Sequence, residues 1–518
     1  MNQKYLISSL FAFGILTGIQ AKDKAPNIIF ILADDMGYGD VSGLNKQSKV
    51  KTPYLDNMIQ NGVSFSDAHT SSSVSTPTRY GVLTGRYNWR SRLKRGVLNG
   101  YSKALIPVNR TTMASLLKQK GYTTGCIGKW HLGWDWTFKK APVNLSTMDA
   151  YDGKGEIDFS APIQNGPVSL GFDYFYGFCG SLDMAPYVYV ENDRVTALPN
   201  RETVNTGMGF WRKGPTGADF IHEETLPHIT DRAISFIEKE SGKEKPFFLY
   251  LPLPAPHTPI LPTEEWMGKS GLNLYGDFVM MVDYEVGRVL QTLKRLGIEE
   301  NTLVVFTADN GCSPQARFEE LQKKGHYPSY IYRGHKADLF EGGHRVPCVV
   351  QWKGVLQTAE SNETICLTDF LATFADIAGI KLQSNEGEDS FSLCPLLRKE
   401  GKSNKFLRNA TIHHSITGEF AIRKGDWKLL VSPSSGGWSE PKPNSVAAKE
   451  LPPMQLYNLK TDPGERKNLY VNEPEKAREL LMLLRKQIKD GRSTTGVPLQ
   501  NETDGTWEQL DYVFNNIE

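Results

Sequence analysis

The sequence predicts an α/β protein with a large, mostly parallel sheet covered by helices on both sides, followed by a smaller antiparallel sheet with one packed helix. Four continuous apolar, β-branched runs are each typical of a strand buried on both faces. Amphipathic helical stretches lie between these runs, and such alternation favours a parallel sheet. From about Arg408 the pattern changes to short strands joined by tight turns, which indicates an antiparallel unit.

The expected elements follow from these patterns in chain order. Buried strands are expected at 26–33, 123–127, 247–252 and 302–307. Helices are expected at 54–61, 109–120, 226–239 and 274–296, the first opened by Thr52-Pro53. The C-terminal unit is expected to have strands at 410–415, 419–423 and 427–431 and a helix at 473–488. Residues 434–450, rich in Ser, Gly, Pro and Lys, are expected to form an exposed loop.

The N-terminus is typical of a secretory signal peptide over residues 1–21. Lys4 precedes the apolar run 5–16, and Ile19-Gln20-Ala21 offers a cleavage site. No later stretch approaches the 18 apolar residues of a membrane span, and no Cys follows the cleavage site. The pattern therefore predicts an exported protein without a membrane anchor, with the periplasm as the first expectation and secretion as the alternative. Two domains are expected beyond the leader, over 22–405 and 406–518.

Charge and cysteine content narrow the function classes further. Lys plus Arg total 59 and Asp plus Glu total 58, for a formal net charge of +1. This balance argues against attachment to nucleic acid or anionic membrane by net charge. The six Cys are scattered without CxxC spacing, which predicts ordinary buried thiols with at most one or two disulfides.

Polar residues follow each of the four buried runs. In open α/β sheets, ligands bind at the carboxyl ends of the strands. Asp34, Asp35, Asp309 and Asn310 supply only oxygen ligands, which favours a hard cation: calcium first, magnesium second. Two adjacent carboxylates repel each other unless a cation or an Arg lies between them. The alternative for Asp34-Asp35 is a helix cap or a pair of turn residues.

A Ser before Thr-Pro would ordinarily be a helix N-cap. However, Ser75-x-Pro77-x-Arg79 with Leu83-Thr84-Gly85-Arg86 resembles the signature of the formylglycine-dependent sulfatases, arylsulfatase A-like members of the alkaline-phosphatase-like superfamily. In that family, a Cys or Ser at the first position is oxidised to an aldehyde. Further blocks resemble the family in its order: Asp34-Asp35, 128–133, 256–259, 309–311, 334–336 and 341–347. Thr78 departs from the usual Ser or Ala, and Ser75 from the commoner Cys, so the resemblance implies an anaerobic, Ser-type formylglycine-generating enzyme as maturation partner.

The resemblance implies a role for each block, with 22–405 as the catalytic domain and 406–518 as a subdomain covering the site. A hydrated aldehyde at Ser75 would offer one hydroxyl to the cation and one to attack sulfur. Arg79 and Lys129 would hold that side chain, His131 would be the base that restores the aldehyde, and His257 would protonate the leaving sugar oxygen. Lys336 would neutralise sulfate oxygens. The implied cation ligands are Asp34, Asp35, Ser75, Asp309 and Asn310.

The substrate is expected to be a sulfated oligosaccharide or monosaccharide, because residues 178–194 resemble the insert of sulfatases acting on aryl esters and glycans. The residues expected around the sugar ring are Asp183, Tyr187, Arg86, His413, His414 and Trp438. For His413-His414 the alternative is a strand packed on the large domain. The expected activity is exo-acting desulfation of galactose or N-acetylgalactosamine, with glucosamine-type sugars as the alternative. Two other functions stay open: a phosphoester or phosphonate hydrolase, expected with two zinc ions, and an unmodified glycan-binding homologue.

Overall fold

The computed structural model describes residues 25–140, 155–397, 406–503, 506–507 and 510. The predicted signal peptide and the predicted boundary at 405 lie outside these residues, so both stay predictions. Within the described chain, no helix combines the length and apolar character needed to cross a membrane. Cys126, Cys179, Cys312, Cys348 and Cys366 are buried thiols.

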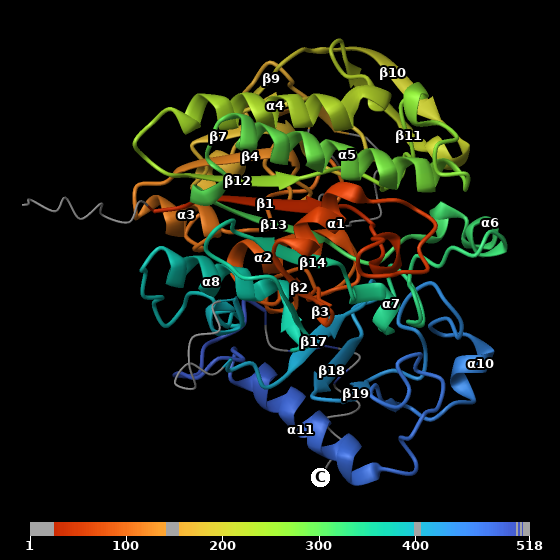
Figure 1. Cartoon of the computed structure of the whole chain (residues 1–518). Coiled ribbons are helices and arrows are strands. Elements are labelled where there is room, and N and C mark those ends of the chain that lie inside the picture. The colour runs from red at the N-terminus through yellow and green to blue at the C-terminus, as the bar shows by residue number, and fades with distance from the viewer. Residues whose placement is uncertain (1–24, 141–154, 398–405, 504–505, 508–509, 511–518) are drawn as a thin grey trace, which may run out of the picture.

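The large sheet lies at the centre of the molecule (Figure 1). Among the described residues it has ten strands in the order β15-β2-β14-β13-β1-β12-β4-β7-β8-β9. The strands of this sheet are β1 (Asn27–Ala33), β2 (Val63–Phe65), β4 (Thr123–Lys129), β7 (Tyr174–Phe178), β8 (Val190–Glu191), β9 (Arg194–Val195), β12 (Phe247–Pro252), β13 (Thr302–Ala308), β14 (Cys348–Gln351) and β15 (Ala359–Ser361). The five strands from β13 to β7 are mutually parallel, whereas β14 and β8 pair antiparallel to their neighbours. The mixed, mostly parallel sheet is therefore confirmed.

The central strands form where the apolar runs predicted them. Every residue of β1, β12 and β13 is buried, because helices cover both faces of the sheet. On one side α1 (Pro53–Gln60), α4 (Thr225–Ser241) and α5 (Leu274–Arg295) pack together. On the other side lie α2 (Ser75–Thr84), α3 (Met113–Lys118) and α8 (Phe370–Ile377), as Figure 1 shows.

Helix α3 is shorter than the expected 109–120. Thr112 is its N-cap and accepts a hydrogen bond from the Ser115 backbone N–H, so the helix begins at Met113. Pro107 accepts from the Arg110 N–H in a turn before it, which keeps residues 107–110 outside the helix.

The smaller C-terminal unit is an antiparallel sheet of β17 (Thr411–His414), β18 (Phe420–Lys424), β19 (Trp427–Leu430) and β20 (Gln455–Asn458). Helix α11 (Pro474–Lys489) packs on it at the bottom of Figure 1, far from α4 and α5. Ile412, Phe420, Leu429 and Leu480 share its apolar core. The smaller sheet with one packed helix is therefore confirmed.

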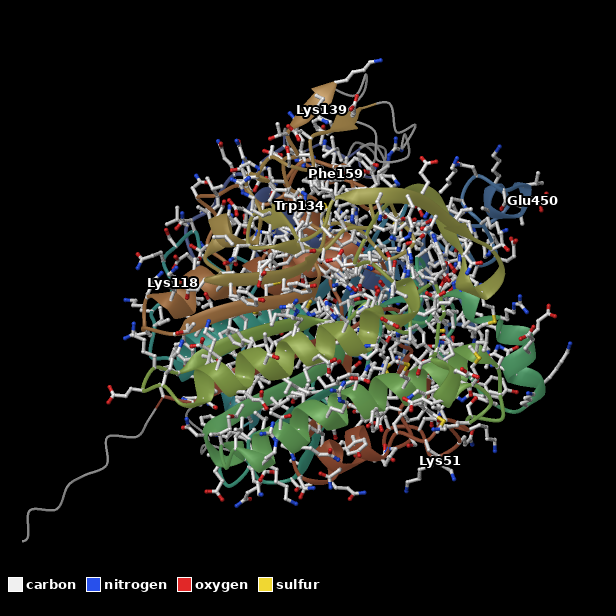
Figure 2. The ribbon with its side chains drawn as sticks, turned by 90° about the horizontal axis from the view of Figure 1, so that it is seen from above. Lys51, Lys118, Trp134, Lys139, Phe159 and Glu450 are labelled. Carbon is white, nitrogen blue, oxygen red and sulfur yellow. The ribbon has the colours of Figure 1, made fainter. Side chains whose placement is uncertain are left out.

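The expected exposed loop at 434–450 is wrong in part. Residues 434–437 are buried, because Ser434 donates to Glu419 and Leu339 donates its N–H to the Ser435 carbonyl. Helix α10 (Val446–Lys449) follows and ends beside the labelled Glu450 in Figure 2. The same view shows Lys139 on β5 (Phe138–Lys140), which pairs antiparallel with β6 (Glu156–Ile157) in a small projecting sheet.

Candidate active site

The carboxyl ends of four neighbouring parallel strands bring the predicted polar residues together. Asp34 and Asp35 follow β1, and Asp309 and Asn310 follow β13. His257 follows β12, Lys129 is the last residue of β4, and His131 comes two residues later. Because these strands are adjacent and parallel, their ends meet at one edge of the sheet.

Ser75 reaches this edge from the first turn of α2. Its hydroxyl donates to Asp34 Oδ1 at 3.3 Å, and the Lys129 ammonium lies 3.4 Å from the same hydroxyl oxygen. Val74 is the N-cap of the helix, so Ser75 is its first helical residue rather than its cap. Ser75 is only 1% exposed. The structure therefore presents this hydroxyl to a cation and a carboxylate inside the protein.

Three buried ion pairs surround Ser75. Lys129 Nζ is 2.6 Å from Asp34 Oδ2, and Lys336 Nζ is 2.8 Å from Asp35 Oδ2. The Arg79 guanidinium donates twice to Asp309 Oδ2, at 2.7 and 3.1 Å. Three carboxylates thus face three cationic side chains, and the formal charges of this set cancel. A divalent cation added among them would leave a positive excess that favours an anion.

The residues present fit a hard cation. Asp34 and Asp35 each offer a carboxylate oxygen to such an ion, and a ring nitrogen of His257 lies within 4.8 Å of both oxygens. Asn310 donates its amide to Asp35 Oδ1 at 2.6 Å, yet its own Oδ1 is buried without a hydrogen-bond partner. A buried acceptor left unpaired is costly unless something else occupies it. The largely oxygen donor set suits calcium or magnesium better than zinc.

Burial and charge set the protonation states at this edge. Burial raises the pKa of Asp34, but Lys129, His257 and Arg79 outweigh it, so the pKa lies well below its usual range. Burial also lowers the pKa of Lys129, partly offset by Asp34. For His131, burial and the nearby Lys129 and Arg79 hold the pKa well below its ordinary value. Asp34 is therefore a carboxylate and His131 a neutral imidazole at neutral pH.

The neutral His131 has a defined tautomer. Its Nε2 lies 2.7 Å from the Leu98 carbonyl oxygen, which can only accept, so Nε2 carries the proton. Its Nδ1 is buried and has no hydrogen-bond partner. His131 consequently holds an unused lone pair, which is what a general base requires.

A cavity of about 970 Å³ opens above the strand ends. Ser75, His131, His257 and Lys336 line it, as do the predicted sugar-contacting residues Asp183 and Trp438. Asp183 forms an ion pair with Arg212 through Oδ2, whereas its buried Oδ1 has no hydrogen-bond partner. Polar and aromatic lining residues that sequence reasoning missed are Arg95, Asn99, Phe210, Arg212, Gln315 and Thr417.

The missed residues carried little signal in the sequence. Phe210 lies between β10 (Pro199–Asn205) and β11 (Trp211–Gly217), a hairpin whose polar strands have no apolar pattern. Arg212 belongs to β11, and Arg95 lies in an irregular segment. For Arg95, the sequence offered one signal: arginines are frequent between residues 86 and 110, which could have indicated an anion-binding segment.

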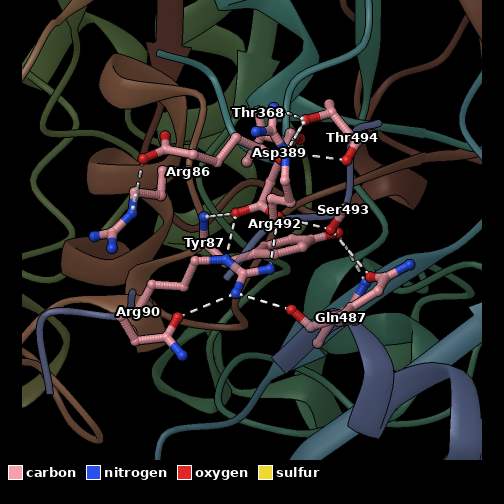
Figure 3. Close-up of polar contacts among 12 residues, drawn as sticks. Arg86, Tyr87, Arg90, Thr368, Asp389, Gln487, Arg492, Ser493 and Thr494 are labelled. Atoms are coloured by element: carbon pink, nitrogen blue, oxygen red, sulfur yellow. Dashed lines mark hydrogen bonds and ion pairs between the residues drawn. The ribbon is translucent and has the colours of Figure 1, made fainter. Parts of the chain in front are cut away.

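Arg86 and Tyr187 are absent from the residues that line this cavity. Arg86 Nη1 donates to the Tyr80 hydroxyl at 3.0 Å and to Glu502 at 2.9 Å, beside the Asp389 network of Figure 3. The Tyr187 hydroxyl donates to the Arg212 carbonyl at 2.6 Å. Their polar groups serve internal contacts, so the expectation that they surround the sugar has no geometric support.

His413 and His414 also lie away from the cavity lining. His414 Nδ1 accepts from the Asn88 amide at 3.1 Å. His413 stacks on His344 with ring centroids 3.8 Å apart and planes 8° from parallel, beside His69. Nitrogen lone pairs lie in the ring plane, so stacked rings cannot both aim one at the same ion. The cluster therefore packs His413 of β17 against His344 and His69, and this stacked arrangement does not suit a metal ion.

Comparison with known proteins agrees with this geometry. The profile of the Sulfatase family matches residues 26–380. The chain is 32% identical to an N-acetylgalactosamine-6-O-sulfatase of Bacteroides thetaiotaomicron, over 93% of this chain and 98% of that protein. It is 31% identical to human arylsulfatase A, over 86% and 83% of the two chains. A structure from work on glycosaminoglycan metabolism by Bacteroides thetaiotaomicron superposes with a TM-score of 0.75 and 32% identity, covering 89% of this chain and 99% of that one.

The chain belongs to the sulfatase family. The resemblance stated from the sequence is thereby confirmed, and the protein is a sulfuric ester hydrolase.

Proposed function

We propose that this protein is an exported carbohydrate sulfatase, periplasmic or secreted, that removes sulfate from a terminal galactose or N-acetylgalactosamine through a formylglycine made from Ser75. The observation that best supports this proposal is that Ser75, Lys129 and Asp34 contact one another beneath the cavity. The N-acetylgalactosamine-6-O-sulfatase among its relatives supports a sugar ester of this kind.

Asp34, Asp35, Asp309 and Asn310 would hold the cation, calcium first and magnesium second. The ion would supply positive charge for the sulfate oxygens and for the oxidised side chain at position 75. Lys336, which lines the cavity, adds a further positive charge beside them. Burial lowers its pKa, but Asp35 and Asp34 more than offset this, so the pKa is raised and Lys336 stays protonated.

Oxidation of Ser75 removes two hydrogen atoms, which pass to the acceptor of a maturation enzyme of the Ser-type, anaerobic class. The hydrated aldehyde would supply two geminal hydroxyls in place of one poorly nucleophilic hydroxyl. Lys129 and Arg79 lie close enough to position such a group: Lys129 Nζ contacts Ser75, and Arg79 donates to the Lys129 carbonyl at 3.2 Å.

His131 and His257 would carry out the two proton transfers of the reaction, one as a base and one as an acid. The Nδ1 lone pair of His131 accepts a proton when sulfate is expelled and the aldehyde is restored. His257 donates its Nδ1–H to the Thr258 carbonyl, which leaves Nε2, 3.6 Å from Asp35 Oδ2, to carry the proton given to the leaving oxygen.

Asp183 and Trp438 are the residues proposed to contact the sugar. The unpaired Oδ1 of Asp183 would accept a sugar hydroxyl while Arg212 fixes its other oxygen. Trp438 lines the cavity and is 37% exposed, so part of its face is open to stack on a ring. Trp438 and Thr417 come from the C-terminal unit, which closes one side of the cavity and favours a terminal sugar over the middle of a chain.

Two measurements test the proposal. Mass spectrometry of the peptide containing Ser75 should show the loss of two hydrogens, and a Ser75→Ala variant should show neither this loss nor turnover. The purified enzyme should release sulfate from 6-sulfated galactose or N-acetylgalactosamine faster than from internal units of matched polymers. An unmodified Ser75 in active enzyme would overturn the formylglycine, and activity restricted to glucosamine sulfates or phosphoesters would overturn the substrate.

A further inference from the structure

Arg95 differs from the other arginines of its segment. Five arginines lie between residues 86 and 110, and four of them donate to protein oxygens. Those four are Arg86 with Glu502, Arg90 with Asp389, Arg92 with the Lys103 carbonyl, and Arg110 with Glu388. Arg95 is exposed and has no hydrogen-bond or ion-pair partner in the part of the chain that the structure describes. It nevertheless lines the cavity above Ser75.

The other cations of the cavity lining are already paired. Lys336 contacts Asp35 at 2.8 Å, and Arg212 contacts Asp183, the one carboxylate among the described lining residues. Arg95 therefore places in the cavity wall a guanidinium whose N–H donors have no protein partner among the described residues. A guanidinium stays charged at any physiological pH and presents donors in a planar fork that matches a carboxylate or a sulfate.

We infer that Arg95 binds a second anionic group of the substrate, a carboxylate or sulfate on the reacting sugar or its neighbour. This inference rests on the proposed function and names its substrate class more narrowly. The sulfate being hydrolysed has its own cations in Lys129, Arg79 and Lys336, and these lie around Ser75. Among the described residues Arg95 shares no carboxylate partner with these three side chains, so its donors are available to a separate anion.

The test compares substrates that differ by one anion. They are a monosulfated sugar, the same sugar with a second sulfate, a disaccharide joining the monosulfated sugar to a uronate, and the disaccharide with that uronate reduced to the neutral sugar. Wild-type enzyme should show a lower KM for at least one substrate that carries the second anion. Arg95→Gln should raise that KM about ten- to a hundredfold and leave kcat within about twofold, because a charge-assisted hydrogen bond to the second anion is lost while the groups around Ser75 stay intact.

Two further variants sharpen the result. Arg95→Lys should recover part of the effect, because it restores charge without the fork. Arg466→Gln removes one exposed arginine that lines a different cavity, and it should leave every KM unchanged. Comparison of the KM values for the disulfated sugar and the uronate disaccharide shows whether Arg95 binds a sulfate or a carboxylate.

The outcomes separate this inference from the proposed function. An enzyme that hydrolyses the monosulfated sugar but shows equal KM values with and without the second anion overturns the Arg95 site alone. An Arg95→Gln variant that loses kcat equally on all four substrates does the same. An enzyme that hydrolyses none of the sugars overturns the proposed function, and the inference falls with it.

Discussion

The ammonium nitrogen of Lys129 lies 3.4 Å from the hydroxyl oxygen of Ser75. The Lys129 side chain is fully buried, and its second contact is Asp34 Oδ2 at 2.6 Å. Both partners are fixed by the fold, since Lys129 ends strand β4 and Ser75 begins helix α2. A strand end and a helix start therefore hold one cation and one hydroxyl together without solvent between them.

Lys129→Met should lower kcat by about a hundred- to a thousandfold, because it removes a positioned charge beside the reacting centre. Initial rates on an aryl sulfate measure this, and the mass of the Ser75 peptide tests whether the proposed oxidation still occurs in the variant. Lys118→Met is the control, since Lys118 forms a half-exposed surface pair with Asp173. Equal rates for the two variants would contradict a role for Lys129.

Removal of the cation should abolish turnover while leaving the sheet folded. The ligands stand at strand ends, outside the apolar core. Asp35→Asn should lower the metal content measured by elemental analysis and weaken the rise in melting temperature on adding calcium. Asp173→Asn, at a surface pair, should change neither. Full activity in chelator, or two zinc ions per chain, would contradict the single-cation site.

His257→Ala should impair sulfated sugars far more than an activated aryl sulfate. A sugar alkoxide leaves poorly without protonation, whereas a phenolate leaves unaided. His131→Ala should impair both substrates, because restoration of the proposed aldehyde does not depend on the leaving group. Steady-state kcat for both variants on both substrates provides the comparison, and equal losses in His257→Ala would exclude His257 as the acid.

Acid should destabilise the protein through its buried histidines. Burial lowers the pKa of His414 from 6.5 to about 4, and it also lowers the pKa values of His344 and His413. Below pH 6.5 the unfolded chain takes up protons that the folded chain refuses, so stability falls as the pH drops from 6.5 toward 4. His414 alone accounts for roughly 3 kcal/mol of this loss.

Urea unfolding measured across this pH window tests the histidine prediction. His414→Gln should flatten part of the decline, because glutamine does not titrate. A decline of unchanged steepness in that variant would assign the acid sensitivity to other groups.

Lys428 should be important for joining the C-terminal sheet to the short helix Glu341–His344. It lies in β19, fully buried, with Nζ 3.0 Å from Glu341 and 2.8 Å from Glu465. Lys428→Met leaves Glu465 without its cation and removes one of the cations beside Glu341, which keeps Arg345 at 3.2 Å. The change should cost about 3–5 kcal/mol of unfolding free energy. Lys424→Met breaks only a half-exposed pair with Glu479 and should cost about 1 kcal/mol or less. Similar costs in denaturant unfolding would contradict the assignment.

The central sheet was predictable because its strands are buried on both faces. Continuous apolar runs mark β1, β12 and β13 without any knowledge of their partners. The hairpin of β10 and β11 was not predictable, since most of its residues are polar and several are exposed. For the same reason, the sequence did not predict that Arg212 of this hairpin lines the cavity.

The strand-end residues of the site were predictable for a topological reason, but the sugar-contacting set was not. Asp34 and Asp309 follow adjacent parallel strands, so their meeting is a property of the sheet. Arg86 and His413 have side chains capable of binding a sugar, yet they bind Glu502 and the Thr70 carbonyl instead. Residue type tells what a side chain can bind, and only packing tells which partner it meets.

The near-complete burial of Ser75 imposes an order on the biosynthesis of this protein. A hydroxyl with 1% of its residue exposed, at the start of a packed helix, is beyond the reach of another enzyme's active site. The oxidation proposed for Ser75, if a separate enzyme carries it out, must therefore happen while residues 75–86 are still an unfolded segment. Trp438 and Thr417, which complete the cavity wall, are synthesised hundreds of residues later. On the proposed function, the interval between those two moments would be the time available for converting Ser75 into formylglycine.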